Sequence, residues 1–160
     1  MRRLHAALIV ALLAVAVPPA PLAVMVHGAG GGGWEYDFWR PVFERAGYRV
    51  ETPDLAPGPH GLGKTTFADY TNQVESFGRP DVLIGASMGG VLVLKAAAKL
   101  RPRCLVLVCS GLPAGIRPSE VAPPYPEVIR WKDGPYDDTV ASMPDSDEET
   151  RRWAWSRWRD

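Results

Sequence analysis

The chain has no surplus of positive or negative charge. Its 160 residues include 18 lysines and arginines against 18 aspartates and glutamates, so the formal net charge is zero. Proteins that bind nucleic acids or anionic membranes carry excess positive charge, so we expect no nucleic-acid partner. Apolar residues make up 46% of the chain and charged residues 22%, which is typical of a globular domain with its own core.

Cysteine and histidine are scarce. The two cysteines, Cys104 and Cys109, lie on one predicted strand and point to opposite faces, so no disulfide is expected between them. We expect both to be buried as small apolar residues. The histidines, His5, His27 and His60, are far apart in the sequence and have no metal-ligand spacing. No metal site is therefore predicted, and no cofactor is expected.

The apolar run at the N-terminus is too short for a stable membrane span. It follows two arginines, covers residues 6–13, continues into an A-V-A cleavage pattern and is interrupted by Pro18 and Pro19. This layout predicts a secretory signal over residues 1–16 and a secreted or periplasmic protein. The alternatives are an uncleaved anchor, or a cytoplasmic protein whose true start lies near Pro21.

Short apolar runs alternate with helical segments over residues 17–111. Apolar runs of this kind suit strands that are covered on both faces. The alternation predicts an α/β fold, with a parallel sheet and helices on both of its faces. Strands are expected at residues 22–26, 48–52, 81–84 and 104–109, and helices at residues 36–46, 66–77 and 90–100.

The composition changes after residue 110. Residues 113–126 are rich in proline and are predicted to form a loop. Ser146 and Glu149 have the spacing of a capping box, which predicts a helix from there to the end of the chain. This helix carries three of the six tryptophans.

The stretch Gly85–Gly89 reads G-A-S-M-G and lies between a predicted strand and a predicted helix. A serine at such a turn projects from the carboxyl edge of the sheet, at the positive end of the helix dipole. This position predicts acyl transfer with Ser87 as the nucleophile. The amide of Met88 and an amide of the glycine-rich loop after residue 26 are expected to stabilise the oxyanion.

Three motifs resemble those of the α/β-hydrolase superfamily, most closely its small esterase, methylesterase and hydroxynitrile-lyase-like branch. They are V-M-V-H-G-A-G-G-G-G-W, A-G-Y-R-V-E-T-P-D-L and I-G-A-S-M-G-G, within residues 22–113. The resemblance implies Ser87 as nucleophile, Ala29 and Met88 as oxyanion-hole amides, a small ester or similar acyl substrate, and structural roles for His27 and His60. It also implies that residues 112–160 begin a helical cap, with the tryptophans lining the pocket or packing the cap.

The expected triad acid and base are missing. The family order is serine, then acid, then histidine, but no histidine follows Ser87. The aspartates that do follow it lie in the cap region: Asp133, Asp137, Asp138, Asp145, Asp147 and Asp160. We therefore expect a truncated hydrolase core with very weak esterase activity at best. The strand at residues 104–109 would be an unpaired apolar edge, which favours aggregation.

Three other functions remain open from the sequence. Lyases use the same scaffold, and a non-catalytic binding protein would retain Ser87 as a relic. Gly58–Thr65 also satisfies the P-loop pattern for nucleotides. However, the preceding residues 53–57 contain two prolines and are a poor strand. The sequence predicts neither the exact substrate nor the oligomeric state.

Overall fold

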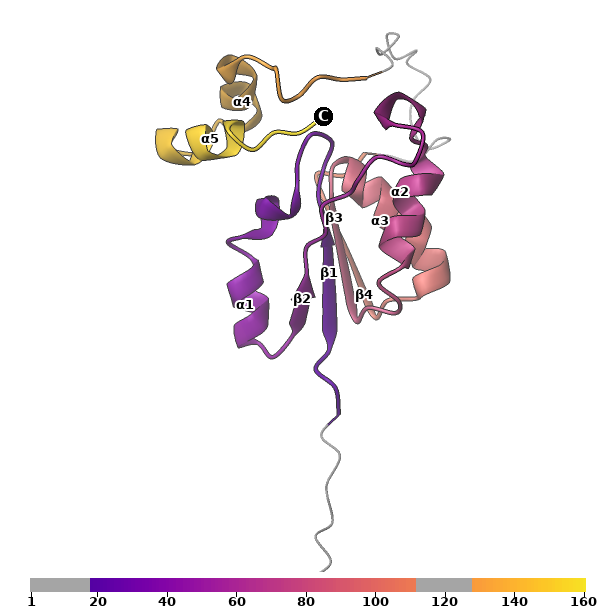
Figure 1. Cartoon of the computed structure of the whole chain (residues 1–160). Helices are drawn as coiled ribbons and strands as arrows, with labels where there is room; N and C mark the ends of the chain where they lie inside the picture. Colours follow the sequence, from indigo (N-terminus) through magenta and orange to yellow (C-terminus); the bar gives the residue numbers. More distant parts are fainter. Residues whose placement is uncertain (1–17, 112–127) are drawn as a thin grey trace, which may run out of the picture.

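A computed structural model describes residues 18–111 and 128–160 (Figure 1). In these ranges four strands form one parallel sheet in the order β2-β1-β3-β4, which confirms the predicted fold class. The strands are β1 (Leu22–Val26), β2 (Arg49–Glu51), β3 (Val82–Ala86) and β4 (Cys104–Val108). β1 and β3 occupy the centre, so the loops that follow them lie next to each other at the carboxyl edge.

Helices cover both faces of the sheet, as predicted. α1 lies on one face, and α2 and α3 lie on the other (Figure 1). Successive residues of β1 enter different cores: Val24 packs in the cluster beneath α2 and α3, and Met25 packs in the cluster on the α1 side. Both side chains are fully buried. The helices are α1 (Arg40–Arg45), α2 (Phe67–Glu75) and α3 (Met88–Leu100).

Local signals explain where these helices begin. The helix expected at residues 36–46 is shorter in the structure: a 3-10 turn, η1 (Gly33–Tyr36), comes before it, and α1 begins at Arg40 with Pro41 in its first turn. Thr66 caps α2: its hydroxyl accepts the amide N–H of Asp69, whose carboxylate in turn accepts the Thr66 N–H.

Two short helices stand above the carboxyl edge of the sheet (Figure 1). They are α4 (Tyr136–Ser142), which the sequence pattern did not predict, and α5 (Glu148–Trp155). The predicted capping box was wrong: Asp147 caps α5, accepting the Thr150 amide at 2.7 Å. A carboxylate suits this position because its charge complements the helix dipole. The expected helix to the chain end was also wrong, because α5 ends at Trp155.

The prediction of buried cysteines was wrong. Cys104 and Cys109 are both exposed free thiols. β4 forms the edge of the sheet and pairs with β3 on one side only, within the ranges described. Its residues are therefore half-buried or exposed, and Leu107 is 44% exposed to solvent.

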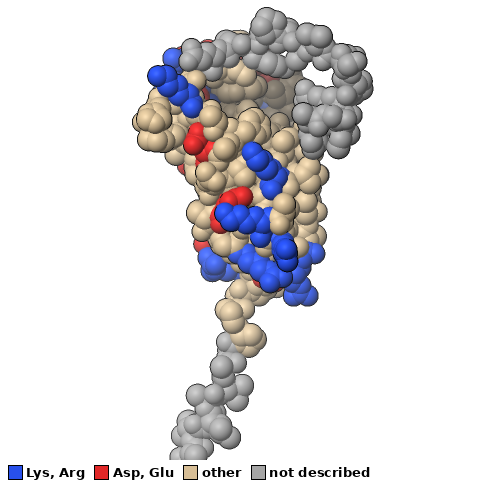
Figure 2. All heavy atoms as spheres, turned by 90° about the vertical axis from the view of Figure 1, so that its right-hand side faces the viewer, with Lys and Arg blue, Asp and Glu red and all other residues tan. Residues whose placement is uncertain are grey.

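The predicted signal segment, residues 1–16, and most of the predicted loop at residues 113–126 lie outside the described residues. No helix of the described ranges is long and apolar enough to cross a membrane. On the face drawn in Figure 2, lysine and arginine side chains gather toward the lower end, away from the carboxyl edge of the sheet.

Candidate active site

Ser87 joins β3 directly to α3. β3 ends at Ala86 and α3 begins at Met88, so the serine occupies the strand-to-helix turn that the sequence predicted. Its backbone has φ +49° and ψ −116°, a conformation that is unfavourable for a residue with a Cβ. The Ser87 N–H donates to the Val108 carbonyl at 3.0 Å, and the Ser87 side chain is exposed.

Glycines allow this turn to pack closely against the sheet. A Cβ on Gly85 would lie 2.4 Å from the Gly89 carbonyl oxygen, and one on Gly89 would lie 2.3 Å from the His27 carbonyl oxygen. These are backbone neighbours that cannot rotate away. Hydrogen is the only substituent that fits at both positions.

The glycine-rich loop after β1 lies against the Ser87 turn. A Cβ built on Gly28 would be 3.2 Å from the Cβ of Ser87. Ala29 follows Gly28, and both Ala29 and Met88 line the same pocket. In residues 18–111 and 128–160 the Ala29 amide has no backbone acceptor, and the Met88 amide, as the first of α3, has no acceptor within its helix.

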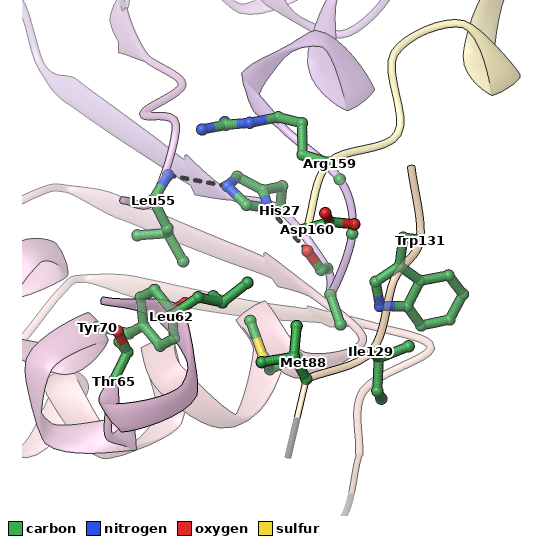
Figure 3. Close-up of a pocket in the computed structure, with 15 residues that line it drawn as sticks. His27, Leu55, Leu62, Thr65, Tyr70, Met88, Ile129, Trp131, Arg159 and Asp160 are labelled. Atoms are coloured by element: carbon green, nitrogen blue, oxygen red, sulfur yellow. Dashed lines mark hydrogen bonds between the residues drawn. The ribbon is translucent and has the colours of Figure 1, made fainter. Parts of the chain in front are cut away.

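The pocket is open, and its lining combines apolar side chains with polar and charged ones. Figure 3 shows Trp131 and Ile129 on one side and Leu62, Thr65 and Tyr70 on the other, with Met88 between them. The pocket encloses about 200 Å³, several times the roughly 30 Å³ that a water molecule occupies in the liquid. A small organic group therefore fits. Ser87 lies at the adjoining turn and is not one of the lining residues.

His27 has no free ring nitrogen to serve as a base. Its Nδ1 donates to the Gly28 carbonyl at 2.7 Å, and its Nε2 accepts the Leu55 N–H at 2.9 Å (Figure 3). Burial lowers the pKa of His27 below its ordinary value. The neutral ring therefore ties the end of β1 to the segment after β2, which agrees with a structural role. His60 is exposed.

Two of the aspartates after Ser87 make other contacts. Asp160 lines the pocket, but its carboxylate accepts a hydrogen bond from the Arg130 guanidinium at 3.1 Å and from the Lys132 N–H at 3.2 Å. Asp147 caps α5. In the parts of the chain described, no three metal-ligating side chains come together.

Two residues near the loop were missed by sequence reasoning. Glu35 of η1 accepts the Gly28 N–H at 3.2 Å, and burial raises the pKa of this carboxyl. Arg159 donates its backbone N–H to the Gly30 carbonyl at 2.7 Å. Its guanidinium lies 2.9 Å from the Asp54 carboxylate as an ion pair, without the alignment of a hydrogen bond.

Tryptophans of residues 128–160 pack against the glycine-rich loop and against η1. The Trp131 ring lies against Gly30, where a Cβ would be 2.4 Å from Cγ of the ring. Trp34 of η1 makes edge-to-face contacts with Trp153 at 5.2 Å and with Trp158 at 5.4 Å between ring centroids. These contacts pack Trp153 of α5, and Trp158 just after α5, against η1.

The stretch that matches the P-loop pattern has a different setting. β2 ends at Glu51, and the next six residues contain no strand leading into Gly58. The Gly58 N–H donates to the Thr65 hydroxyl at 2.8 Å, so the loop closes on itself around a 3-10 turn, η2 (Leu62–Lys64). A phosphate-binding loop requires a strand running directly into its first glycine.

A sequence profile of the alpha/beta hydrolase family matches residues 23–160. The chain belongs to this family. This result confirms the resemblance carried by the three motifs, and it agrees with the parallel sheet and the strand-to-helix turn at Ser87.

Two curated relatives match part of the chain. Salicylic acid-binding protein 2 of Nicotiana tabacum is 37% identical over 78 residues, which are 42% of this chain and 30% of that protein. A carbendazim hydrolyzing esterase of Nocardioides sp. (strain SG-4G) is 33% identical over 94 residues, which are 53% of this chain and 39% of the esterase. The matches thus span about a third of each relative.

Among solved structures, a methylesterase from Arabidopsis has a TM-score of 0.64. The match covers 87% of this chain and 65% of the methylesterase at 19% identity. At this identity the likeness concerns the fold alone.

Proposed function

We propose that this alpha/beta hydrolase chain carries the nucleophile and the oxyanion-binding amides of a serine hydrolase that acts on a small ester or similar acyl substrate. The observation that carries the proposal is the Ser87 turn. An exposed hydroxyl stands at a positive φ between β3 and α3, with Gly28 packed against its Cβ. A strained serine at such a turn is typical of nucleophiles on this fold.

The amides of Ala29 and Met88 are proposed to bind the oxyanion. The Ser87 hydroxyl would attack the carbonyl carbon and lose its proton, while the carbonyl oxygen takes up negative charge between the two N–H groups. The leaving alcohol then departs with a proton, and water hydrolyses the acyl-serine. The pocket shared by Ala29 and Met88 supports this assignment because it offers room for the acyl group beside them.

The general base is proposed to lie outside these 160 residues. No histidine follows Ser87, and both ring nitrogens of His27 are engaged in hydrogen bonds. Without a base, attack by the serine hydroxyl is slow, although an oxyanion hole alone retains about 10³–10⁴-fold over water. We therefore propose that this chain by itself reacts weakly.

A small organic ester with an apolar group is the substrate class that the pocket favours. Its walls include Trp131 and Tyr70 together with aliphatic side chains. One curated relative is named for carbendazim hydrolysis and another for salicylic acid binding, and these names are consistent with small aromatic molecules. Export of the protein through the N-terminal signal is proposed on the sequence pattern alone.

Covalent labelling with a fluorophosphonate tests the nucleophile. We expect slow modification of the folded chain, located at Ser87 by mass spectrometry, and faster modification when imidazole supplies the missing base. Ser87→Ala should abolish both the labelling and the acceleration by imidazole. Ser76→Ala, which alters an exposed serine at the end of α2, should change neither.

The same experiment separates the alternatives. A non-catalytic binding protein would leave Ser87 unlabelled even with imidazole, and modification spread equally over several serines would also contradict the proposal. Imidazole-dependent hydrolysis of a p-nitrophenyl ester, corrected for the Ser87→Ala background, then shows whether the labelled serine transfers an acyl group.

A further inference from the structure

The loop proposed to bind the oxyanion is unusually free in its backbone. Residues 28–33 read G-A-G-G-G-G. Glycine adopts more backbone conformations than any other residue, so a run of glycines is costly to hold in one shape. A catalytic amide must nevertheless be fixed before the substrate arrives. Something other than the loop's own sequence therefore has to hold Ala29 in place.

The Glu35 carboxyl fills the inside of this loop. Its Oε2 accepts the Gly28 N–H at 3.2 Å. Its Oε1 lies where a Cβ of Gly31 would stand, at 1.6 Å from that ideal position. The Gly31 N–H closes the turn by donating to the Gly28 carbonyl at 3.3 Å. The carboxyl thus contacts both ends of the turn that carries Ala29.

Glu35 is itself held firmly by its neighbours. The Tyr36 hydroxyl donates to the Val26 carbonyl at 2.8 Å, and the Gly33 N–H donates to Asp54 at 2.7 Å. These bonds anchor η1 on both sides of Glu35 to the end of β1 and to the segment after β2. A half-buried carboxyl costs free energy, and its bond to a backbone amide offsets part of that cost.

We propose that Glu35 is the positioning residue of the oxyanion loop, holding the Gly28–Gly31 turn from the inside so that the Ala29 amide stays unbonded at the pocket. This inference rests on the proposed function for the role of the Ala29 amide. The contacts by which Glu35 fixes the loop do not depend on the proposed function. In residues 18–111 and 128–160 the hydrogen bond of the Glu35 side chain is to the Gly28 N–H, so we assign its effect on the reaction to the position of the loop.

A matched pair of variants tests the role. Glu35→Gln keeps the size and an oxygen that accepts the Gly28 N–H, whereas Glu35→Met keeps a similar volume without an acceptor. With imidazole present, we expect Glu35→Met to lower the maximal rate of fluorophosphonate labelling at Ser87 by at least about tenfold, since loss of a full oxyanion donor costs about 10²–10³. The probe concentration for half-maximal rate should change little.

Glu35→Gln should restore labelling to within about threefold of the parent chain, because its amide oxygen replaces the acceptor. Asp37→Ala, at an exposed acidic residue just past η1, is the control and should leave the rate unchanged. Thermal melting establishes that each variant is folded. Glu35→Ala serves as the second variant without an acceptor if Glu35→Met does not fold.

Hydrogen exchange gives a readout that does not need Ser87 chemistry. In NMR spectra the Gly28 amide should exchange faster in Glu35→Met and remain protected in Glu35→Gln. If the parent chain is not labelled at Ser87, the proposed function fails while the exchange data still test the hold on the loop. Equal labelling rates or equal Gly28 protection in folded Glu35→Met and Glu35→Gln would overturn the proposal for Glu35.

Discussion

His27 illustrates how one residue links distant parts of the fold. Its ring donates to the Gly28 carbonyl and accepts the N–H of Leu55, 28 positions along the chain. The acceptor role requires an uncharged Nε2, so protonation would break the bond to Leu55. The buried ring therefore ties the stability of the site to pH.

We predict that the folded chain loses stability as pH falls through about 6.5, the unperturbed histidine pKa. Burial lowers the pKa of His27 in the folded state, so the unfolded state binds more protons in this range, and the free energy of unfolding rises with pH there. Urea unfolding at several pH values measures this slope. His27→Gln should flatten the slope, whereas His60→Gln, at an exposed residue, should retain it.

Glu35 changes the pH dependence of stability in the opposite direction, because burial raises its pKa. Since Glu35 is present in both His27→Gln and His60→Gln, its contribution cancels when the two slopes are compared. Equal slopes for the two variants would contradict the assignment to His27.

Single residues differ in how far their roles were visible in the sequence. Ser87 was predictable because the G-x-S-x-G spacing and the flanking strand and helix are local features. Glu35 was not, since its partner Gly28 is seven positions away across a loop. No periodic pattern encodes that approach.

At the scale of elements, η1 and α5 are joined by aromatic side chains. Trp34 packs edge-to-face against Trp153, and Phe38 lies 6.1 Å from the same ring. Trp155 is on α5 as well, but it packs against Tyr136 of α4 and donates to the Gly134 carbonyl at 3.1 Å. On α5, Trp153 therefore packs against η1, whereas Trp155 packs against α4.

We predict that Trp153→Ala releases the C-terminal segment from the loop, while Trp155→Ala mainly loosens the α4–α5 pair. Trp153 is half-buried, and an edge-to-face aromatic pair contributes about 0.5–1.5 kcal/mol beyond the area it buries, so its loss favours local opening of this segment. Limited proteolysis within residues 128–160 should be several-fold faster for Trp153→Ala than for the parent chain, while the sheet core stays intact. A core that unfolds together with this segment would show that the two parts are one cooperative unit.

Boundaries of elements were predicted best where a strong local signal acts. The continuous apolar run at residues 22–26 predicted β1 with the bounds that the structure has. The spacing of Ser146 and Glu149 predicted the wrong cap for α5, which is capped by the adjacent Asp147. α4 has few apolar residues in Y-D-D-T-V-A-S, so its periodicity was too weak to recognise.

At the scale of the whole molecule, β4 is the exposed edge of the sheet. It pairs only with β3 among the described residues, and Leu107 is 44% exposed. Unpaired backbone groups beside an apolar side chain favour strand-to-strand association between molecules.

We predict that the chain self-associates with rising concentration and that Leu107→Lys weakens this association at least severalfold, because a charge at an edge strand opposes pairing. Sedimentation velocity over a concentration series measures the effect. Val42→Lys introduces the same charge at an exposed position of α1, away from the edge, and should have little effect. Equal weakening by both variants would indicate a general effect of charge.

The division into a core at residues 17–111 and a cap from residue 112 remains a prediction, as does the signal at residues 1–16. The sequence by itself determined the alternating strands and helices, the parallel sheet and the position of Ser87, because hydrophobic period and turn residues act over a few neighbours. Only the tertiary structure decided that both ring nitrogens of His27 form hydrogen bonds, that Glu35 fills the glycine-rich loop, and that Cys104 and Cys109 are exposed. These outcomes depend on contacts between segments that packing brings together.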